Sequence, residues 1–159
     1  MALKRSKLAR KPLKKSYTGK LLGGSKLKRT EANKGTSKKK PKTLSKYKKE
    51  LDAVFSKYIR QRDNHTCFTC GMVMDPKKSQ NGHFVPRQYL ALRWDERNCN
   101  AQCYADNVLY NGQPSVYAIK LVEKYGTGIL EELESKRKEI VKLKEAYYQE
   151  NIAHYKSLL

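Results

Sequence analysis

Four cysteines between residues 67 and 103 are the part of this sequence best suited to chemistry. Cys67 and Cys70 form a C-x2-C pair, and Cys99 and Cys103 form a C-x3-C pair. Structural zinc sites commonly take two thiolate or imidazole ligands from each of two such turns. Lys or Arg interrupts every short apolar run near the start of the chain, so we expect no secretion signal. In an intracellular protein this spacing predicts a structural Zn²⁺ site rather than disulfides.

The fourth ligand of this site stays open between two residues. Cys67, Cys70 and Cys103 are expected to supply three thiolates. Asp106 follows Cys103 at the C-x2-C spacing, and its carboxylate can bind zinc. Cys99 offers the softer ligand, four residues before Cys103.

His83 lies between the two cysteine pairs, and Asn107 follows the second pair. A lone histidine in a strand is more often packed or exposed than catalytic, but its place between two metal turns favours a chemical role. A neutral imidazole, with a pKa of about 6.5, can accept a proton from water at neutral pH.

Regular elements are expected around these residues. Residues 44–62 place apolar side chains at helical spacing, with Lys and Arg on much of the opposite face, which predicts an amphipathic helix. Residues 67–74 fit a short strand and a metal turn, and a second strand at 83–85 would complete a β-hairpin. A short helix is expected over 103–110, whereas residues 86–97 cannot be assigned.

The remainder of the chain is expected to be helical. Ser115 can begin a helix that Gly126 stops after Tyr125, and a second helix starts near Thr127. From about Ser135 to the end, the apolar spacing predicts one long amphipathic helix. These helices would pack on the metal-binding segment, or an exposed apolar stripe would form a homodimer, and the sequence does not distinguish the two.

Positive charge is concentrated at the start of the chain. The 159 residues carry 35 Lys+Arg against 15 Asp+Glu, a net charge of +20, and residues 1–50 alone hold 19 basic against 2 acidic residues. This asymmetry predicts a polyanion partner whose phosphates are attracted regardless of sequence. We expect residues 1–43 to form a disordered, Lys/Arg-rich tail that binds nucleic acid. No segment approaches the roughly 18 apolar residues of a membrane span, so we expect a soluble protein without a membrane partner.

Two phrases in the middle of the chain form a recognisable pattern. They are Gly82-His83-Phe84 and the run RWDERNCNAQCYADN at residues 93–107, which fit G-H-[FY] followed by R-[FW]-x-x-x-N-C-x-x-Q-C-x-x-[CD]-N. This pattern resembles that of the NinG (Rap) family of phage recombination proteins. The likeness extends over about residues 50–159 and includes Lys124-Tyr125-Gly126. The layout also resembles the His-Asn-His (HNH), or ββα-metal, endonucleases, among which the phage recombination endonuclease VII type has a similar zinc-plus-HNH arrangement.

The resemblance implies an α+β fold, in which a small zinc-stapled ββα-metal (HNH) finger at residues 65–111 is embedded in a mainly helical domain at 44–159. The helices of that domain would lie at 44–62 and 113–159. The implied activity is cleavage of branched DNA, such as Holliday junctions or other recombination intermediates, with Mg²⁺ or Mn²⁺ as the catalytic cofactor. Two symmetrical cuts in a junction would make a homodimer natural.

The resemblance also implies roles for three residues. His83 would be the general base that activates water, Asn107 would hold the catalytic metal, and Asn98 would brace the loop of the finger. Many HNH enzymes have an Asp directly before the base, where this chain has Gly82. Another acid would then have to complete the catalytic site, and the candidates are Asp95 and Asp106, or else the ion is weakly held.

Basic and aromatic residues near His83 are the predicted DNA contacts. They are Arg87, Arg93, Trp94 and Arg97. Arginine can clamp a phosphate with two hydrogen bonds, and an aromatic ring can stack on an unpaired base at a branch point. The resulting hypothesis is a phage-encoded, metal-dependent endonuclease that acts on branched DNA in the cytoplasm of the bacterial host. The alternative is a non-catalytic zinc-finger protein that binds nucleic acid as an accessory in recombination or packaging.

Overall fold

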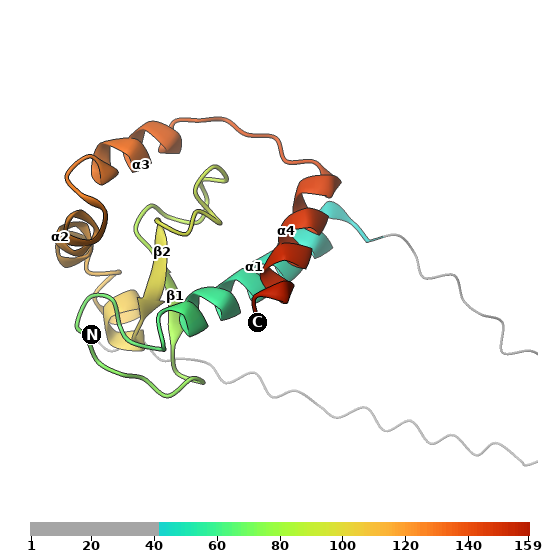
Figure 1. Cartoon of the computed structure of the whole chain (residues 1–159). Coiled ribbons are helices and arrows are strands. Elements are labelled where there is room, and N and C mark those ends of the chain that lie inside the picture. The colour runs from blue at the N-terminus through green and yellow to red at the C-terminus, as the bar shows by residue number, and fades with distance from the viewer. Residues whose placement is uncertain (1–41) are drawn as a thin grey trace, which may run out of the picture. The chain divides into compact units, whose positions relative to one another are not determined.

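The computed structural model describes residues 42–159, which fold around one two-stranded antiparallel sheet (Figure 1). The predictions made for the basic tail fall on residues outside that range, apart from its last two positions. The α+β class is confirmed, because the small sheet is accompanied mainly by helices. In chain order the elements are α1 (Leu44–Arg62), β1 (Gln80–His83), β2 (Cys99–Gln102), the short π-helix η1 (Ala105–Leu109), α2 (Pro114–Tyr125), α3 (Ile129–Arg137) and α4 (Glu145–Ser157).

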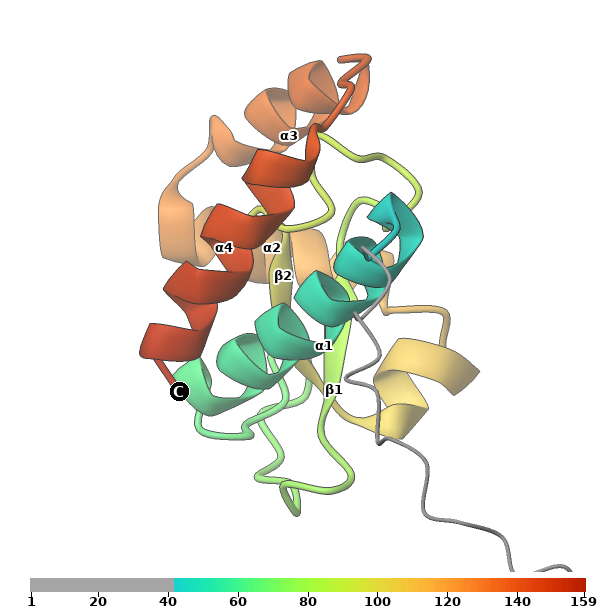
Figure 2. The same ribbon diagram turned by 90° about the vertical axis from the view of Figure 1, so that its right-hand side faces the viewer.

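The sheet lies between two helical layers. Figure 2 shows α1 and α4 crossing on one side of the strands, with α2 and α3 on the other side. Side chains alternate between the faces of a strand, and β2 follows this rule. Cys99 packs into the cluster formed by α1 and α4, whereas the Asn100 amide donates to the Tyr117 hydroxyl of α2 at 3.1 Å. Both faces of the sheet are therefore covered.

Helix α1 covers the residues over which a helix is expected, and its apolar stripe forms the larger core. Leu51, Phe55 and Ile59 recur every four residues and are buried. They pack against Tyr155 and its neighbours on α4, and the Phe55 and Tyr155 ring centroids lie 5.0 Å apart. Trp94, from the loop between the strands, completes this cluster. None of the helices between residues 42 and 159 is both long and apolar enough to cross a membrane.

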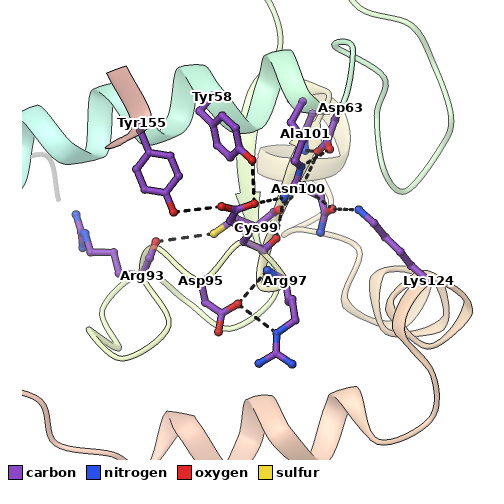
Figure 3. A network of polar contacts seen from close by, with 12 residues as sticks. Tyr58, Asp63, Arg93, Asp95, Arg97, Cys99, Asn100, Ala101, Lys124 and Tyr155 are labelled. Carbon is purple, nitrogen blue, oxygen red and sulfur yellow. Dashed lines mark hydrogen bonds and ion pairs between the residues drawn. The ribbon is translucent and has the colours of Figure 1, made fainter. Parts of the chain in front are cut away.

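A polar network joins the end of α1 to β2 (Figure 3). The Asp63 carboxylate accepts hydrogen bonds from the Ala101 backbone N–H at 2.7 Å and from Arg62 Nε at 2.8 Å. Arg62 also donates to the carbonyl oxygen of Cys99 at 2.9 Å. Because strand β2 has only four residues, these bonds hold its register against the helix.

The predicted β-hairpin is wrong in its pairing. The segment 67–74 forms one isolated bridge, between Thr66 and Val73, and is otherwise the turn that carries the first cysteine pair. The strand ending at His83 pairs instead with β2, with His83 opposite Cys99. Sequence periodicity did not reveal β2, because all four of its residues are buried and two of them are amides.

The long helix expected from Ser135 onward is also wrong, because the segment contains a break. Helix α3 ends at Arg137 and α4 begins at Glu145, and Ile140 between them is 94% exposed. Leu133 of α3 packs with α2, whereas Tyr148 of α4 packs with α1. The chain has to pass from one helical layer to the other, so a single helix cannot serve both.

Removing the Asp63 carboxylate tests the junction between α1 and β2. We expect Asp63→Ala to lower the free energy of unfolding by about 2 to 4 kcal/mol, because it removes the closest carboxylate from the largely buried Arg62 cation and leaves the Ala101 N–H without its acceptor. Urea denaturation followed by circular dichroism measures this loss. Glu131→Ala removes the same charge from an exposed position and should change little. Equal stability of the two variants would contradict the role assigned to Asp63.

Candidate metal centre and candidate active site

Four side chains converge beside the start of η1. The sulfur atoms of Cys67, Cys70 and Cys103 and a carboxylate oxygen of Asp106 all lie within 4.8 Å of one another, so they could hold a metal ion. The first two come from a tight turn in which Gly71 adopts a φ of 75°, a conformation that glycine tolerates best. Cys103 follows β2 directly, and Asp106 lies in η1.

Hydrogen bonds within the cluster prepare these groups to carry negative charge. The Cys103 backbone N–H donates to the Cys67 sulfur at 3.3 Å, and the Asp106 backbone N–H donates to the Cys103 sulfur at 3.4 Å. The Thr69 hydroxyl donates to the Asp106 carboxylate at 2.6 Å. Desolvation, together with the neighbouring Cys67 and Asp106, raises the pKa of Cys70 to about 12. A cation among these groups would relieve that crowding of charge.

The structure separates the two candidates for the fourth ligand. Asp106 is buried and faces the three thiols. Cys99 lies on the face of β2 that packs against α1, and its thiol points to the Arg93 carbonyl oxygen at 3.8 Å (Figure 3). Complete burial raises the pKa of Cys99 well above its ordinary value. The interpretation of Cys99 as a ligand is therefore corrected in favour of Asp106.

His83 and Asn107 line one open groove of about 590 Å³. His83 is the last residue of β1, and Asn107 lies in η1. A second groove, of about 390 Å³, lies between β1 and α1. Asn81, His83 and Arg87 line both grooves, so the two meet at the histidine.

The imidazole of His83 is oriented by the loop that follows it. Its Nε2 atom lies 3.2 Å from the carbonyl oxygen of Arg93. A carbonyl can only accept, so in the neutral ring Nε2 carries the proton and Nδ1 is the basic nitrogen. Burial, followed by the positive charges of Arg93 and Arg87, lowers the pKa of His83. The ring is accordingly neutral and able to accept a proton at neutral pH.

Asn98 closes the loop between β1 and β2. Its side chain accepts a hydrogen bond from the Val85 N–H at 2.7 Å and donates to the carbonyl oxygens of Val85 at 2.9 Å and Leu92 at 3.0 Å. The residue is completely buried. These three bonds join the two ends of the loop to its middle, and they keep the carbonyl group of Arg93 near His83.

Amide groups supply the oxygen atoms around the groove. Asn107 Nδ2 donates to Gln80 Oε1 at 2.6 Å, which leaves Asn107 Oδ1 able to accept. Asn81 Oδ1 is buried and has no hydrogen-bond partner in the part of the chain that the structure describes. A cation or a donated proton would satisfy this atom.

Gly82 lies where a side chain has no room. A Cβ atom added there would lie 2.0 Å from Gln102 Oε1, on the neighbouring strand. The Gln102 amide is itself held in place, because Nε2 donates to the Gly112 carbonyl oxygen at 3.0 Å and to the Thr69 hydroxyl at 3.2 Å. An acid cannot be accommodated at position 82 unless Gln102 moves.

Neither acid suggested as a replacement reaches the groove. Asp106 belongs to the cysteine cluster. Asp95 forms an ion pair with Lys136 at 3.0 Å and accepts a hydrogen bond from the Arg97 backbone N–H. The one carboxylate beside His83 among residues 42–159 is Asp52, which is held by Arg93.

Three of the four predicted DNA contacts are occupied within the fold. Arg93 forms a bidentate ion pair with Asp52, at 2.7 and 2.8 Å. Trp94 is buried in the core. Arg97 is paired with Glu132. Arg87 is exposed and lines both grooves, so the geometry favours it over the others.

Sequence reasoning missed several residues of the grooves. Asn81, which lines both grooves, and Gln80, which binds the Asn107 amide, lie directly before Gly82-His83, but polar residues in a short strand carry no pattern that marks a site. Lys49 lines the second groove from α1, where it is one of many lysines along the helix. Only the three-dimensional position distinguishes it.

Comparison with known families identifies the family to which this chain belongs. A family model described as "Bacteriophage Lambda NinG protein" matches residues 3–159. The chain belongs to the NinG family. The NinG match extends over the cysteine cluster, both grooves and every helix of the described part of the chain.

The sequence identity between this chain and individual NinG proteins is low. The "Protein ninG" of Salmonella phage P22 is 29% identical over 91 residues, which is 57% of this chain and 45% of that protein. The "Protein ninG" of Escherichia phage lambda is 26% identical over 88 residues, which is 55% of this chain and 43% of that protein. The matched part thus spans less than half the length of these relatives. No solved structure matches the chain.

Asn98 provides a test of how the loop between β1 and β2 is held. We expect Asn98→Ala to lower the free energy of unfolding by about 2 to 4 kcal/mol, because two carbonyl groups and one N–H lose their partner in a buried setting. Asn98→Asp keeps the acceptor for the Val85 N–H and should fall in between. Urea denaturation measures both, with Gln88→Ala, an exposed change in the same loop, as the control. A fully stable Asn98→Ala protein would refute the clamp.

Proposed function

We propose that this NinG-family protein is a metal-dependent, structure-specific endonuclease of the HNH type that hydrolyses phosphodiester bonds in branched DNA. The observation that carries the proposal is the shared groove of His83 and Asn107, with the imidazole ring oriented by a loop that Asn98 holds closed. The order of strand, loop, strand and short helix agrees with a ββα-metal finger.

The chemistry starts from the orientation of His83. With the proton on Nε2 directed to the Arg93 carbonyl oxygen, Nδ1 can take a proton from a water molecule. The water then attacks the phosphorus of a phosphodiester placed in the groove, opposite the departing 3′ oxygen. The lowered pKa of His83 keeps the base unprotonated at neutral pH.

Mg²⁺ or Mn²⁺ would be held in the groove through neutral oxygen donors. Asn107 Oδ1 and the unpartnered Asn81 Oδ1 are the protein atoms that would hold the ion. When bound, such an ion supplies charge stabilisation for the phosphate and the leaving oxygen. Hard divalent ions accept amide and phosphate oxygens, and Mg²⁺ usually keeps several waters.

The cysteine cluster would hold a structural Zn²⁺ ion. Three thiolates and one carboxylate give the four-ligand set of a closed site, with no open position for a substrate. Its place between the first cysteine turn and η1 would fix Asp106, and with it the position of Asn107.

DNA is the proposed partner because of the charge distribution. Residues 1–50 carry 19 of the 35 basic residues, and such a density attracts any nucleic acid through counterion release. Preference for a branch would therefore come from the folded part. The phage relatives suggest a phage-encoded protein that works in the cytoplasm of a bacterial host.

One observation favours a second candidate, a non-catalytic accessory protein that binds nucleic acid. The groove of His83 and Asn107 has no carboxylate among its described lining residues, whereas catalytic ions are commonly held by one or two. A finger of this kind could bind DNA without cutting it.

Cleavage of a labelled four-way junction separates the two candidates. We expect the full-length protein to cut the junction in preference to a matched linear duplex in Mg²⁺ or Mn²⁺. His83→Ala should slow cutting by about 10²- to 10⁴-fold, the usual contribution of a general base, while retaining DNA binding. His154→Ala, at an exposed position on α4, is the control and should cut normally. Binding by the wild-type protein without cutting in either metal would replace the endonuclease with the accessory protein.

Metal analysis of the purified protein tests the structural ion. We expect about one Zn²⁺ per chain, as four-ligand sites hold a single ion, and we expect Cys67→Ala to lose it and to unfold at a lower temperature. Cys99→Ala should retain the zinc, because its thiol faces α1. Elemental analysis by mass spectrometry gives both values. Loss of zinc in Cys99→Ala together with retention in Asp106→Ala would show that the ligand set is wrong.

A further inference from the structure

The groove between β1 and α1 is a second binding surface beside His83. It has a volume of about 390 Å³. One wall comes from α1, and the other from β1 and the loop that follows it. Because His83 also lines the larger groove that contains Asn107, a chain passing through one groove continues into the other.

The charges of this second groove leave an excess of two cations. Its charged lining residues are Lys49, Asp52, Arg87 and Arg93. Asp52 and Arg93 neutralise each other through their bidentate pair. Lys49 and Arg87 form no ion pair with any residue between 42 and 159, and they come from opposite walls. Two such cations create a site for an anion between α1 and the loop.

The helix wall is shaped to let an extended anion lie close. Ala53 and Ser56 follow Lys49 on the same side of α1 and also line the groove. Both side chains are small, so the long Lys49 side chain projects beside a shallow surface. The Ser56 hydroxyl can donate to a phosphate oxygen. A backbone of linked phosphates fits this arrangement better than a bulky folded ligand does.

We propose that the α1 groove is a second phosphate site, in which Lys49 and Arg87 hold the phosphodiester next to the one presented to His83. This proposal rests on the proposed function and specifies the path of the DNA strand. The strand runs along α1, passes His83 and continues toward Asn107. Lys49 and Arg87 are positioning residues, because they set where the strand lies and do not act on the reacting atoms.

Salt dependence of DNA binding supplies the first measurement. The full-length protein, Lys49→Gln and Lys57→Gln are each titrated onto a labelled four-way junction in EDTA, so that no cutting occurs. Lys57 is exposed on the same helix but does not line the groove, so it is a matched control for charge. We expect Lys49→Gln to weaken binding and to reduce the slope of log K against log salt by about 0.9, the value of one phosphate contact. Lys57→Gln should reduce the slope much less.

Replacing single phosphates of the junction by neutral methylphosphonates supplies the second measurement. With the wild-type protein, neutral groups at two adjacent positions should weaken binding. With Lys49→Gln one of these positions should lose its effect, since the cation that reads that charge is gone, and with Lys57→Gln both should remain. Urea denaturation of each variant establishes that it is folded.

The outcomes distinguish this proposal from the nuclease assignment. Suppose that DNA binding by Lys49→Gln is still weakened by a neutral methylphosphonate at every position, and that its salt slope equals that of Lys57→Gln. The second phosphate site then does not exist. If the interference pattern is as expected but the wild-type protein cuts no DNA in Mg²⁺ or Mn²⁺, the strand path stands and the endonuclease fails. If the protein cuts, the phosphate position whose effect is lost in Lys49→Gln should lie next to the cut.

Discussion

The side-chain amide of Asn98 holds the loop between β1 and β2 closed, and the positions of the groove residues on that loop follow from it. A sheet of two four-residue strands is not stable alone, so packing and side-chain bonds must hold it from outside. Asn98 does this at the loop end of the hairpin, and Asp63 does it at β2. Once the loop is closed, the Arg93 carbonyl oxygen reaches the His83 ring and selects its tautomer. The orientation of the His83 ring is thus a product of backbone groups ordered by buried polar side chains.

The sequence predicted the elements with strong signals and missed those that depend on polar burial. Helix α1 has a clear stripe of Leu51, Phe55 and Ile59, and its expected bounds agree with the observed ones. Strand β2 consists of buried Cys, Asn, Ala and Gln, so neither alternation nor hydrophobicity revealed it. The cysteine spacing indicated three candidate ligands. The choice between Asp106 and Cys99 as the fourth needed the fold, because the Cys99 side chain lies on the face of β2 that packs against α1, whereas Asp106 lies beside the three thiols. The second groove could not be predicted for the same reason, because one wall comes from α1 and the other from residues about thirty positions later in the chain.

The grooves around His83 are electrostatically unusual for a site that would take a divalent ion. The larger groove has no carboxylate among its described lining residues, and Asp52 in the second groove is paired with Arg93. The acid expected at position 82 is excluded by the packing of Gln102 against Gly82. Amide oxygens bind Mg²⁺ more weakly than carboxylates do, so under the proposed function the phosphate oxygens of the substrate would have to supply much of the charge. In such a site the ion and the DNA would stabilise each other. The missing carboxylate would then lower the affinity of the free protein for the ion without preventing the proposed chemistry in the complex.

Asp106 and Asn107 are consecutive residues of η1 that serve different sites, one at the cysteine cluster and the other at the groove. A single peptide group therefore connects the two, and a movement of either side chain is transmitted to its neighbour through the backbone. Thermodynamic linkage would make such a connection reciprocal: if an ion bound at Asp106 changed the affinity of Asn107 for its proposed ligand, that ligand would change the affinity for the ion by the same factor. The compact helical turn that places the two residues would then link the stability of the fold to the affinity for the proposed ligand. A small fold of this kind has little room to keep the two sites independent.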